Sequence, residues 1–274
     1  LSVDHAHSSE AMNRWLHRLH ALFSTEGMPT VPVFTQSILG ALPPAFDGLT
    51  NCKTRLEFFK QRRCIPSVCF ACFKLQILCS DVLSHNRLYC LLRFNEQEPD
   101  LQRKCMIEIR QDVKFPYKGY IFCSSEPSAK HWKVRLQKWM EERGISGVCR
   151  ITHGCSEYGI SFEQFRYQED GRHRLFKPSS DWINNWSAFA TSAHRPSLES
   201  PSFNNVKALS LRDCLAMVYW LNYGVGIGDL STENLDRSLL NSCQAKFTRR
   251  VHKQSKRRFV ELQEIQALVS TNQA

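Results

Sequence analysis

Three cysteines form a C-x4-C-x2-C run in the first third of the chain, at Cys64, Cys69 and Cys72. Two thiols separated by two residues can reach one metal ion from a tight turn or from the first turn of a helix, and a third thiol nearby supplies most of a site. The run therefore predicts a metal centre, with zinc or an iron–sulfur cluster as the cofactor. The same spacing occurs in plant-type [2Fe–2S] proteins, but the glycines that the loop around such a cluster usually contains are missing here.

The fourth ligand must come from another cysteine. If a helix continued through Cys79, that sulfur would lie two turns from the C-x2-C pair, about 10.5 Å away, which is too far to share an ion. Cys105 falls on the inner face of an alternating apolar and polar segment, among core residues. Cys155 follows Gly154 at the end of a predicted strand, where a turn frees the side chain and His153 offers an imidazole. We predict Cys155 as the fourth ligand.

The same side chains allow other interpretations. Three thiols at the start of an apolar helix are also consistent with simple burial, since free cysteine packs well in a core. A redox-active Cys69–Cys72 pair is a second alternative, although no predicted strand precedes it as in thioredoxin-like motifs. A thiol enzyme is a third, because His153 and Cys155 are two residues apart at a strand end and point the same way, as a base and its nucleophile would.

Positive charge is concentrated near the C-terminus, in a stretch that contains no acidic residue. Its seven basic residues are Lys246, Arg249, Arg250, Lys253, Lys256, Arg257 and Arg258. Such a stretch attracts polyanions, because each phosphate contact releases counterions from a nucleic acid. We predict that these residues bind nucleic acid. An acidic protein partner is the alternative, and a solvated helix face is the interpretation without a function.

Aromatic residues lie close to a second basic surface. The predicted helix at 126–143 carries lysines and an arginine on its outer face, and Tyr117, Tyr120 and Phe122 precede it. Nucleic-acid binders often combine basic side chains with exposed aromatic rings on which bases stack. The three aromatic residues are therefore either stacking platforms or ordinary core residues of a strand.

Bulk composition excludes several classes of protein. The chain has 274 residues, 42% of them hydrophobic, and a formal net charge of +10, so extensive disorder is not expected. Twelve cysteines without a visible signal peptide favour reduced thiols and a cytoplasmic location over a secreted disulfide framework. No apolar run approaches the ~18 residues of a membrane span, so we predict no membrane partner.

Hydrophobic periodicity predicts the elements that must position these residues. The predicted helices span 8–23, 54–63, 67–82, 126–143 and 210–224, with a last helix that carries the basic run, and the predicted strands span 105–109, 120–123 and 148–153. The order strand–strand–helix–strand predicts an α+β fold, with a small mixed sheet and a packed helix, flanked by N-terminal and C-terminal helical segments.

The same pattern predicts a division of the chain. Residues 1–50 hold an N-terminal helix and a Pro-rich connector, 51–190 a cysteine-rich α+β core, 191–208 a linker, and 209–274 a C-terminal helical segment with the basic run. The linker is predicted from its Ser, Pro and Asn content.

These features together predict a metal-stabilised, basic protein that binds nucleic acid and is not an enzyme. An iron–sulfur accessory or redox-sensing protein that docks an acidic protein partner is the first alternative, and the Cys/His thiol enzyme is the second. The sequence contains no glycine-rich phosphate loop in a strand–turn–helix context, no H-E-x-x-H and no G-x-S-x-G.

Overall fold

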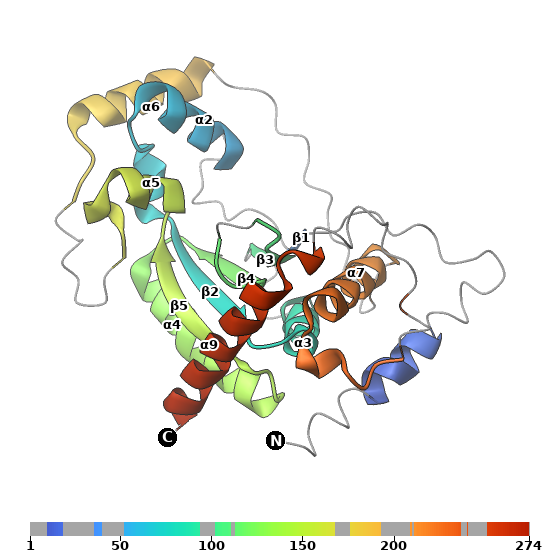
Figure 1. Cartoon of the computed structure of the whole chain (residues 1–274). Helices are drawn as coiled ribbons and strands as arrows, with labels where there is room; N and C mark the ends of the chain where they lie inside the picture. Colours follow the sequence, from blue (N-terminus) through green and yellow to red (C-terminus); the bar gives the residue numbers. More distant parts are fainter. Residues whose placement is uncertain are drawn as a thin grey trace.

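A computed structural model describes residues 10–18, 36–39, 52–93, 102–110, 113–167, 176–192, 209, 211–236, 240 and 251–273. Its centre is a five-stranded sheet with the strand order β1-β3-β4-β2-β5 (Figure 1). The strands are β1 (Gln36–Leu39), β2 (Phe73–Cys79), β3 (Arg103–Ile107), β4 (Tyr117–Cys123) and β5 (Gly147–His153). Every pair of neighbours is antiparallel. The predicted α+β class is confirmed, but the sheet is antiparallel and not mixed.

Helices flank this sheet, and residues 10–18 are also helical. The α-helices are α2 (Cys52–Arg62), α3 (Val82–Arg93), α4 (Glu126–Glu142), α5 (Ser156–Ser161), α6 (Ser180–Ser192), α7 (Leu211–Ile227) and α9 (Ser255–Gln273). The 3-10 helices are η1 (Ser67–Ala71), η2 (Glu163–Phe165) and η4 (Leu230–Thr232). Among the described helices, none is long and apolar enough to cross a membrane.

The order β2-α3-β3-β4-α4-β5 builds the middle of the molecule. The helix α3 joins β2 to β3, which are separated in the sheet by β4, and α4 joins β4 to β5, which are separated by β2. This split arrangement places β2 and β4 at the centre of the four strands and puts both crossover helices on one face. The extra strand β1 extends the sheet beyond β3.

The two faces of the sheet are covered differently. On one face, alternate residues of the four strands join side chains of α3, α4 and α7 in the main core, whose members include Leu75, Ile121, Leu88, Leu136 and Trp220. On the other face, Ile265 of α9 packs with Leu78 and Val148, and Phe115 and Val269 pack against them. Figure 1 shows α9, in red, crossing this face on the side opposite α4. Part of the second face therefore remains open.

One predicted helix is wrong. The segment 67–82 contains the short helix η1 and then the strand β2, followed by α3 from Val82. The apolar residues Leu75, Ile77 and Leu78 suggested a helix buried on every side, but β2 is a central strand that packs against helices on both faces near Leu78. Its alternation of buried and half-buried residues, with Lys74 and Gln76 on the open face, is the period of a strand.

The other predicted elements agree with the structure where it describes them. The helix α4 begins after Ser125, whose hydroxyl accepts a hydrogen bond from the Ser128 amide, and ends before Gly144, which has a φ of 57°. The predicted linker 191–208 and the connector before residue 52 lie largely outside the described residues. Both α7 and α9 contribute to the main core, through side chains such as Trp220 and Leu262.

A second, smaller group of helices lies at one end of β2 and β5. It consists of α2, η1, α5, η2 and α6, which pack through aromatic side chains. Phe59 meets Tyr158 edge to face, with 4.8 Å between ring centres, and Phe58 meets Trp186 at 5.1 Å. Figure 1 shows these helices beyond the ends of the two strands. Cys64, Cys69 and Cys155 pack in this part of the fold, whereas Cys79, Cys105, Cys123 and Cys149 lie in the main core.

Candidate functional site

The open face of the sheet presents its side chains in rows that the strand register fixes. Lys74 lies between Phe122 and Thr152, while Gln76 lies between Tyr120 and Arg150. Lys104 extends the second of these rows on β3, opposite Tyr120. A third row, which includes Leu78 and Val148, is the one that α9 covers. The first two rows are the exposed part of this face.

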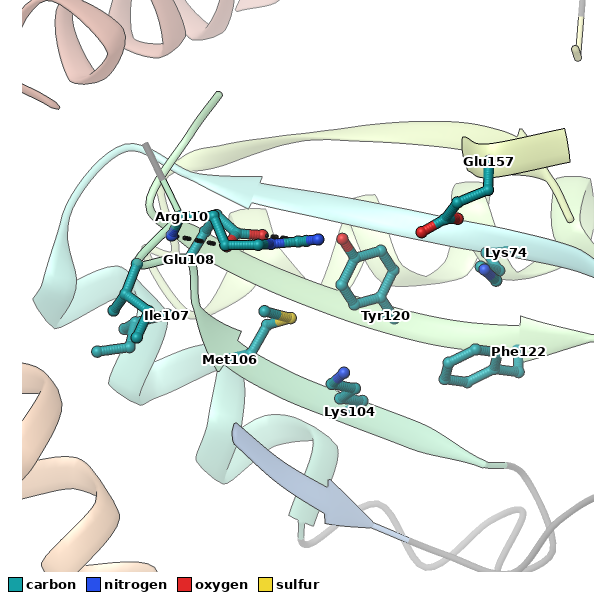
Figure 2. A pocket seen from close by; sticks show the side chains of 10 residues that line it. Lys74, Lys104, Met106, Ile107, Glu108, Arg110, Tyr120, Phe122 and Glu157 are labelled. Atoms are coloured by element: carbon teal, nitrogen blue, oxygen red, sulfur yellow. Dashed lines mark hydrogen bonds and ion pairs between the residues drawn. The ribbon is translucent and has the colours of Figure 1, made fainter. Parts of the chain in front are cut away.

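These rows form the floor of a pocket of about 470 Å³. Figure 2 shows the ring of Tyr120 in the middle of the pocket, with Phe122 further along the same strand and Lys74 and Lys104 on the strands to either side. The pocket is lined by Lys74, Lys104, Met106, Ile107, Glu108, Ile109, Arg110, Tyr120, Phe122 and Glu157. It therefore combines an aromatic floor with basic side chains.

The two aromatic rings are held in place by polar neighbours. The ring centres of Tyr120 and Phe122 are 6.3 Å apart and the ring planes make an angle of 31°. The Gln76 amide donates a hydrogen bond of 3.1 Å to the Tyr120 hydroxyl, and the Lys74 ammonium lies 5.7 Å from the centre of the Phe122 ring. Both rings are half-buried, so each keeps part of its surface open to the pocket.

The far end of the pocket contains a buried carboxylate. Glu108 accepts two hydrogen bonds from the Arg110 guanidinium, of 2.9 and 2.8 Å, and lies 3.7 Å from the Lys118 ammonium. Burial raises the pKa of Glu108, but these hydrogen bonds and the Lys118 charge outweigh burial and hold the pKa below its usual value. Burial lowers the pKa of Lys118 to about 8, although Glu108 opposes the shift. Glu108 is thus an ionised carboxylate whose negative charge is compensated by Arg110 and Lys118.

The other charged groups that line the pocket are the ammonium groups of Lys74 and Lys104 and the carboxylate of Glu157, so the lysines leave an excess of positive charge. Lys104 has no ion-pair partner among the residues that the structure describes, and burial together with the charge of Lys74 lowers its pKa. Two lysines that repel one another beside aromatic rings favour an anionic ligand that also has flat, apolar surfaces. Nucleotides have both properties.

Comparison with known proteins found no match: neither a family model, nor a curated protein, nor a solved structure matches the chain.

The structure separates Cys64 from the other predicted metal ligands. Its sulfur donates to the Arg62 carbonyl oxygen at 3.2 Å, and its side chain packs with Phe58 and Trp186. Burial and the charge of Asp181 raise the pKa of Cys64, and the charge of Arg62 opposes the shift. Cys69 packs instead in the cluster that contains Phe59 and Tyr158, so Cys64 and Cys69 lie in different aromatic clusters. The set of four metal ligands stays a prediction.

The other three predicted ligands share one neighbourhood. Burial raises the pKa of Cys69 to about 12 and that of Cys72 to about 11, and the charge of Cys155 adds to both shifts. Cys52, at the start of α2, influences Cys72 and Cys155 in the same way. Within the described ranges, however, no three or more His, Cys, Asp or Glu side chains are arranged to hold a metal ion as they stand.

Both ring nitrogens of His153 are engaged by backbone carbonyl groups and not by Cys155. Its ring stacks between Phe73 and Phe165, and its two nitrogens lie 3.0 Å from the Phe165 carbonyl oxygen and 2.8 Å from that of Phe70. The sulfur of Cys155 instead accepts from the Lys74 ammonium at 3.8 Å. Burial also raises the pKa of Cys155. The described geometry therefore offers no base beside a reactive thiolate.

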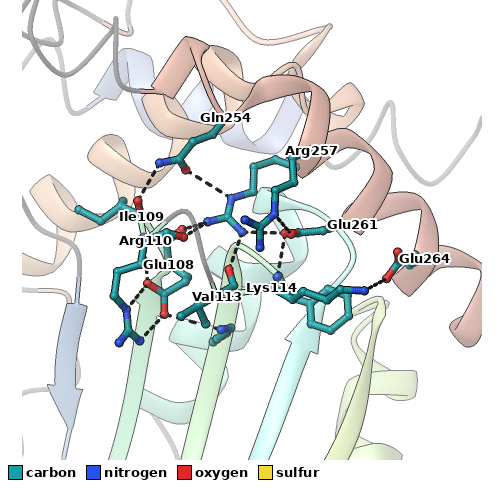
Figure 3. Close-up of polar contacts among 12 residues, drawn as sticks. Glu108, Ile109, Arg110, Val113, Lys114, Gln254, Arg257, Glu261 and Glu264 are labelled. Atoms are coloured by element: carbon teal, nitrogen blue, oxygen red, sulfur yellow. Dashed lines mark hydrogen bonds and ion pairs between the residues drawn. The ribbon is translucent and has the colours of Figure 1, made fainter.

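One member of the predicted basic run is a structural residue. Arg258 is fully buried, and its guanidinium donates to the carbonyl oxygens of Glu108, Arg110 and Val113 and to the Glu261 carboxylate, at 2.7 to 3.0 Å (Figure 3). The prediction that Arg258 contacts phosphate is wrong, because every direction of its guanidinium is occupied by the protein. Lys253, Lys256 and Arg257 are exposed. Lys246, Arg249 and Arg250 lie outside the described residues.

Sequence reasoning missed several residues of the site. Lys74 and Gln76 were not predicted to act, because β2 was expected to be a helix, and Lys104 lies just before the predicted strand 105–109. The alternation from Phe73 to Ile77 was the signal that could have placed Lys74 and Gln76 on one face of a strand. Tyr120 and Phe122 were predicted as one of two alternatives, and the register now places both on the open face.

Proposed function

We propose that this chain is a binding protein for single-stranded nucleic acid, and that the strand lies on the open face of the sheet. The observation that carries this proposal is the pair of rings, Tyr120 and Phe122, side by side on a central strand with lysines on both neighbouring strands. Sheet-based RNA-binding modules stack unpaired bases on aromatic side chains in this way.

The spacing of the rings favours unpaired bases. Bases within one strand of a duplex are about 3.4 Å apart along the helix axis, whereas the two ring centres are 6.3 Å apart. Each ring can accept its own base only if the bases have separated from one another. A duplex, whose bases are already stacked and paired, does not meet this condition.

Basic side chains are placed to contact the phosphates between such bases. The ammonium groups of Lys74 and Lys104 lie on the strands to either side of β4, one next to Phe122 and the other opposite Tyr120. At the far end of the pocket, the backbone of Arg110 contacts Arg258, so the exposed Lys253, Lys256 and Arg257 lie close to the same end. These residues extend the basic surface beyond the pocket.

The sequence pattern of β4 agrees with this function. Lys118, Gly119 and Tyr120 are followed by Phe122, an order of basic, glycine and aromatic residues that is typical of RNA-binding strands of this kind. Gly119 allows α3 to approach the sheet, since a Cβ atom there would lie 2.6 Å from Leu88 Cδ2. Lys118 departs from the usual role, because it is buried beside Glu108.

The test is a binding titration of the full chain with a labelled single-stranded oligonucleotide of mixed sequence and with the matching duplex. Tyr120→Ala and Phe122→Ala are each expected to weaken single-strand binding by about 1–3 kcal/mol, or roughly 5- to 150-fold, because each loses one stacking platform. Tyr120→Phe keeps the ring and should bind nearly as wild type does. Ile160→Ala, which alters an exposed apolar side chain on α5, is the matched control.

Two results would contradict the proposal. If the duplex binds as tightly as the single strand, the open face does not select unpaired bases. If both alanine variants bind as wild type does while binding still weakens with salt, the basic residues near the C-terminus bind polyanions without the aromatic rings. That result would favour the alternative of an acidic protein partner.

A further inference from the structure

Glu157 brings a carboxylate to the end of the pocket that contains Phe122. It lies in the first turn of α5, two residues after Cys155, whose sulfur accepts from the Lys74 ammonium at 3.8 Å. The same ammonium lies 5.7 Å from the centre of the Phe122 ring, so the start of α5 is close to this ring. Figure 2 shows Glu157 at the same end of the pocket as Lys74 and Phe122, with its side chain directed inward from α5.

The carboxylate of Glu157 keeps acceptor positions for a ligand. The Ser156 hydroxyl donates to Glu157 Oε2 at 3.2 Å, and no residue in the described part of the chain forms an ion pair with Glu157. Glu108, at the other end of the pocket, differs because it accepts two hydrogen bonds from Arg110 and lies 3.7 Å from the Lys118 ammonium. A carboxylate has two oxygens with about four lone pairs. Glu157 can therefore accept two hydrogen bonds from a bound molecule.

This carboxylate restricts the bases that the pocket can accept. A negative charge close to a phosphate weakens binding, unless the ligand also presents hydrogen-bond donors to that charge. Guanine has two neighbouring donors, N1–H and the N2 amino group, which match the two oxygens of a carboxylate. Adenine and cytosine have one amino group next to an acceptor nitrogen, and uracil and thymine have one N–H between two carbonyl oxygens. Guanine is thus the common base that fits a carboxylate with two donors.

We propose that Glu157 selects guanine for the base that stacks on Phe122. The inference rests on the proposed function, because the edge of the base that carries N1–H and the N2 amino group is free only in an unpaired strand. Phe122 supports the face of the base, Glu157 accepts from its edge, and Lys74 contacts the neighbouring phosphate. Any other base places an acceptor atom against the carboxylate, which disfavours it.

The experiment compares four labelled single strands in binding titrations with the full chain. One is an oligothymidylate of about ten nucleotides, a length within the usual range for one binding module. The other three carry a single guanine, adenine or cytosine at the centre of the same strand. The wild type should bind the guanine strand about 5- to 150-fold more tightly than the other three, as expected for one bidentate contact to a base.

Glu157→Gln tests the carboxylate itself. Glutamine presents one donor and one acceptor, which match adenine and not guanine. The variant should lose the preference for guanine and bind the adenine strand at least as tightly as the guanine strand. Its affinity for the plain oligothymidylate should not fall, because the substitution removes a negative charge. Glu163→Gln, which makes the same change at an exposed position on η2 outside the pocket, is the matched control and should keep the guanine preference.

The outcomes separate this inference from the proposed function. If the wild type prefers single strands to the duplex but binds all four single strands equally, the selection of guanine is wrong and the proposed function stands. If Glu157→Gln keeps the guanine preference of the wild type, another group recognises the base and the role of Glu157 is wrong. If the wild type binds none of the single strands, both the proposed function and this inference fail.

Discussion

The Lys74 ammonium lies 3.8 Å from the Cys155 sulfur and also 5.7 Å from the centre of the Phe122 ring. The ammonium therefore lies between an aromatic ring of the proposed nucleic-acid surface and a thiol at the end of β5. This follows from the register of β2, which pairs Lys74 with Phe122 on one side and with Thr152 on the other. A change at Lys74 should consequently alter the Phe122 end of the proposed nucleic-acid surface.

Replacement of Lys74 by Met is expected to weaken single-strand binding. The variant should lose one phosphate contact, so the slope of log K against log salt should become shallower by about 0.7. Lys104→Met, on the strand at the other side of β4, should change the slope by a similar amount. Lys138→Met, whose side chain is 76% exposed on α4, is the control and should leave the slope unchanged. Binding titrations at several salt concentrations measure all three slopes, and unchanged slopes for Lys74→Met and Lys104→Met would contradict the phosphate contacts.

Removal of the Arg258 guanidinium is expected to destabilise the fold. Arg258→Met removes a guanidinium donor from the buried Glu261 carboxylate and from the carbonyl oxygens of Glu108, Arg110 and Val113, which should lower the free energy of unfolding by about 3–5 kcal/mol. Arg257→Met, next to it, breaks only a pair whose arginine is 42% exposed and should cost less than about 1 kcal/mol. Urea unfolding measures both. Similar losses for the two variants would mean that the buried network does not anchor α9.

The elements whose signals are local were predictable from the sequence. The helix α4 has a capping serine, an apolar stripe and a terminal glycine within its own residues, and β3 and β5 have short runs of alternating residues. Nothing in these signals depends on a distant part of the chain. They fixed the α+β class but not the strand order, because the order depends on which strands pair.

The residues of the pocket come together through contacts between distant segments, which the spacing of residues in the sequence does not reveal. Lys74 and Phe122 are 48 positions apart in number, and only the pairing of β2 with β4 places them together. Arg258 has the same side chain as its exposed neighbour Arg257, and it is buried because the loop after β3 offers it three carbonyl oxygens.

The buried Lys118 predicts a pH dependence of stability. Burial lowers its pKa to about 8 in the folded protein, against about 10.4 in an unfolded chain. Between these two values the unfolded state holds more protons, so the Lys118 contribution to the unfolding free energy rises with pH and is constant below about pH 8. The difference in unfolding free energy between wild type and Lys118→Met should therefore shift in favour of wild type from pH 8 to 10.

The control for this prediction is an exposed lysine. Lys138→Met, whose side chain is 76% exposed, should differ from wild type by an amount that does not change over the same pH range. Unfolding in urea at several pH values measures both differences. If the Lys118→Met difference is as flat as that of Lys138→Met, the lysine is not titrating in the folded protein.

Two glycines with left-handed backbone conformations, Gly228 and Gly154, allow the cost of backbone strain to be measured apart from the cost of a steric clash. Gly228 has a φ of 77°, and a Cβ atom there would have no described atom within 4 Å, so Gly228→Ala should cost only the conformational strain of about 1–2 kcal/mol. Gly154 has a φ of 56°, and a Cβ atom there would lie 2.3 Å from Phe165 Cε1. Gly154→Ala should therefore cost about 1–3 kcal/mol more, as an overpacked core does. Calorimetric unfolding measures the two losses of stability. Equal losses in the two variants would mean that the close approach of Phe165 adds nothing to the strain at Gly154.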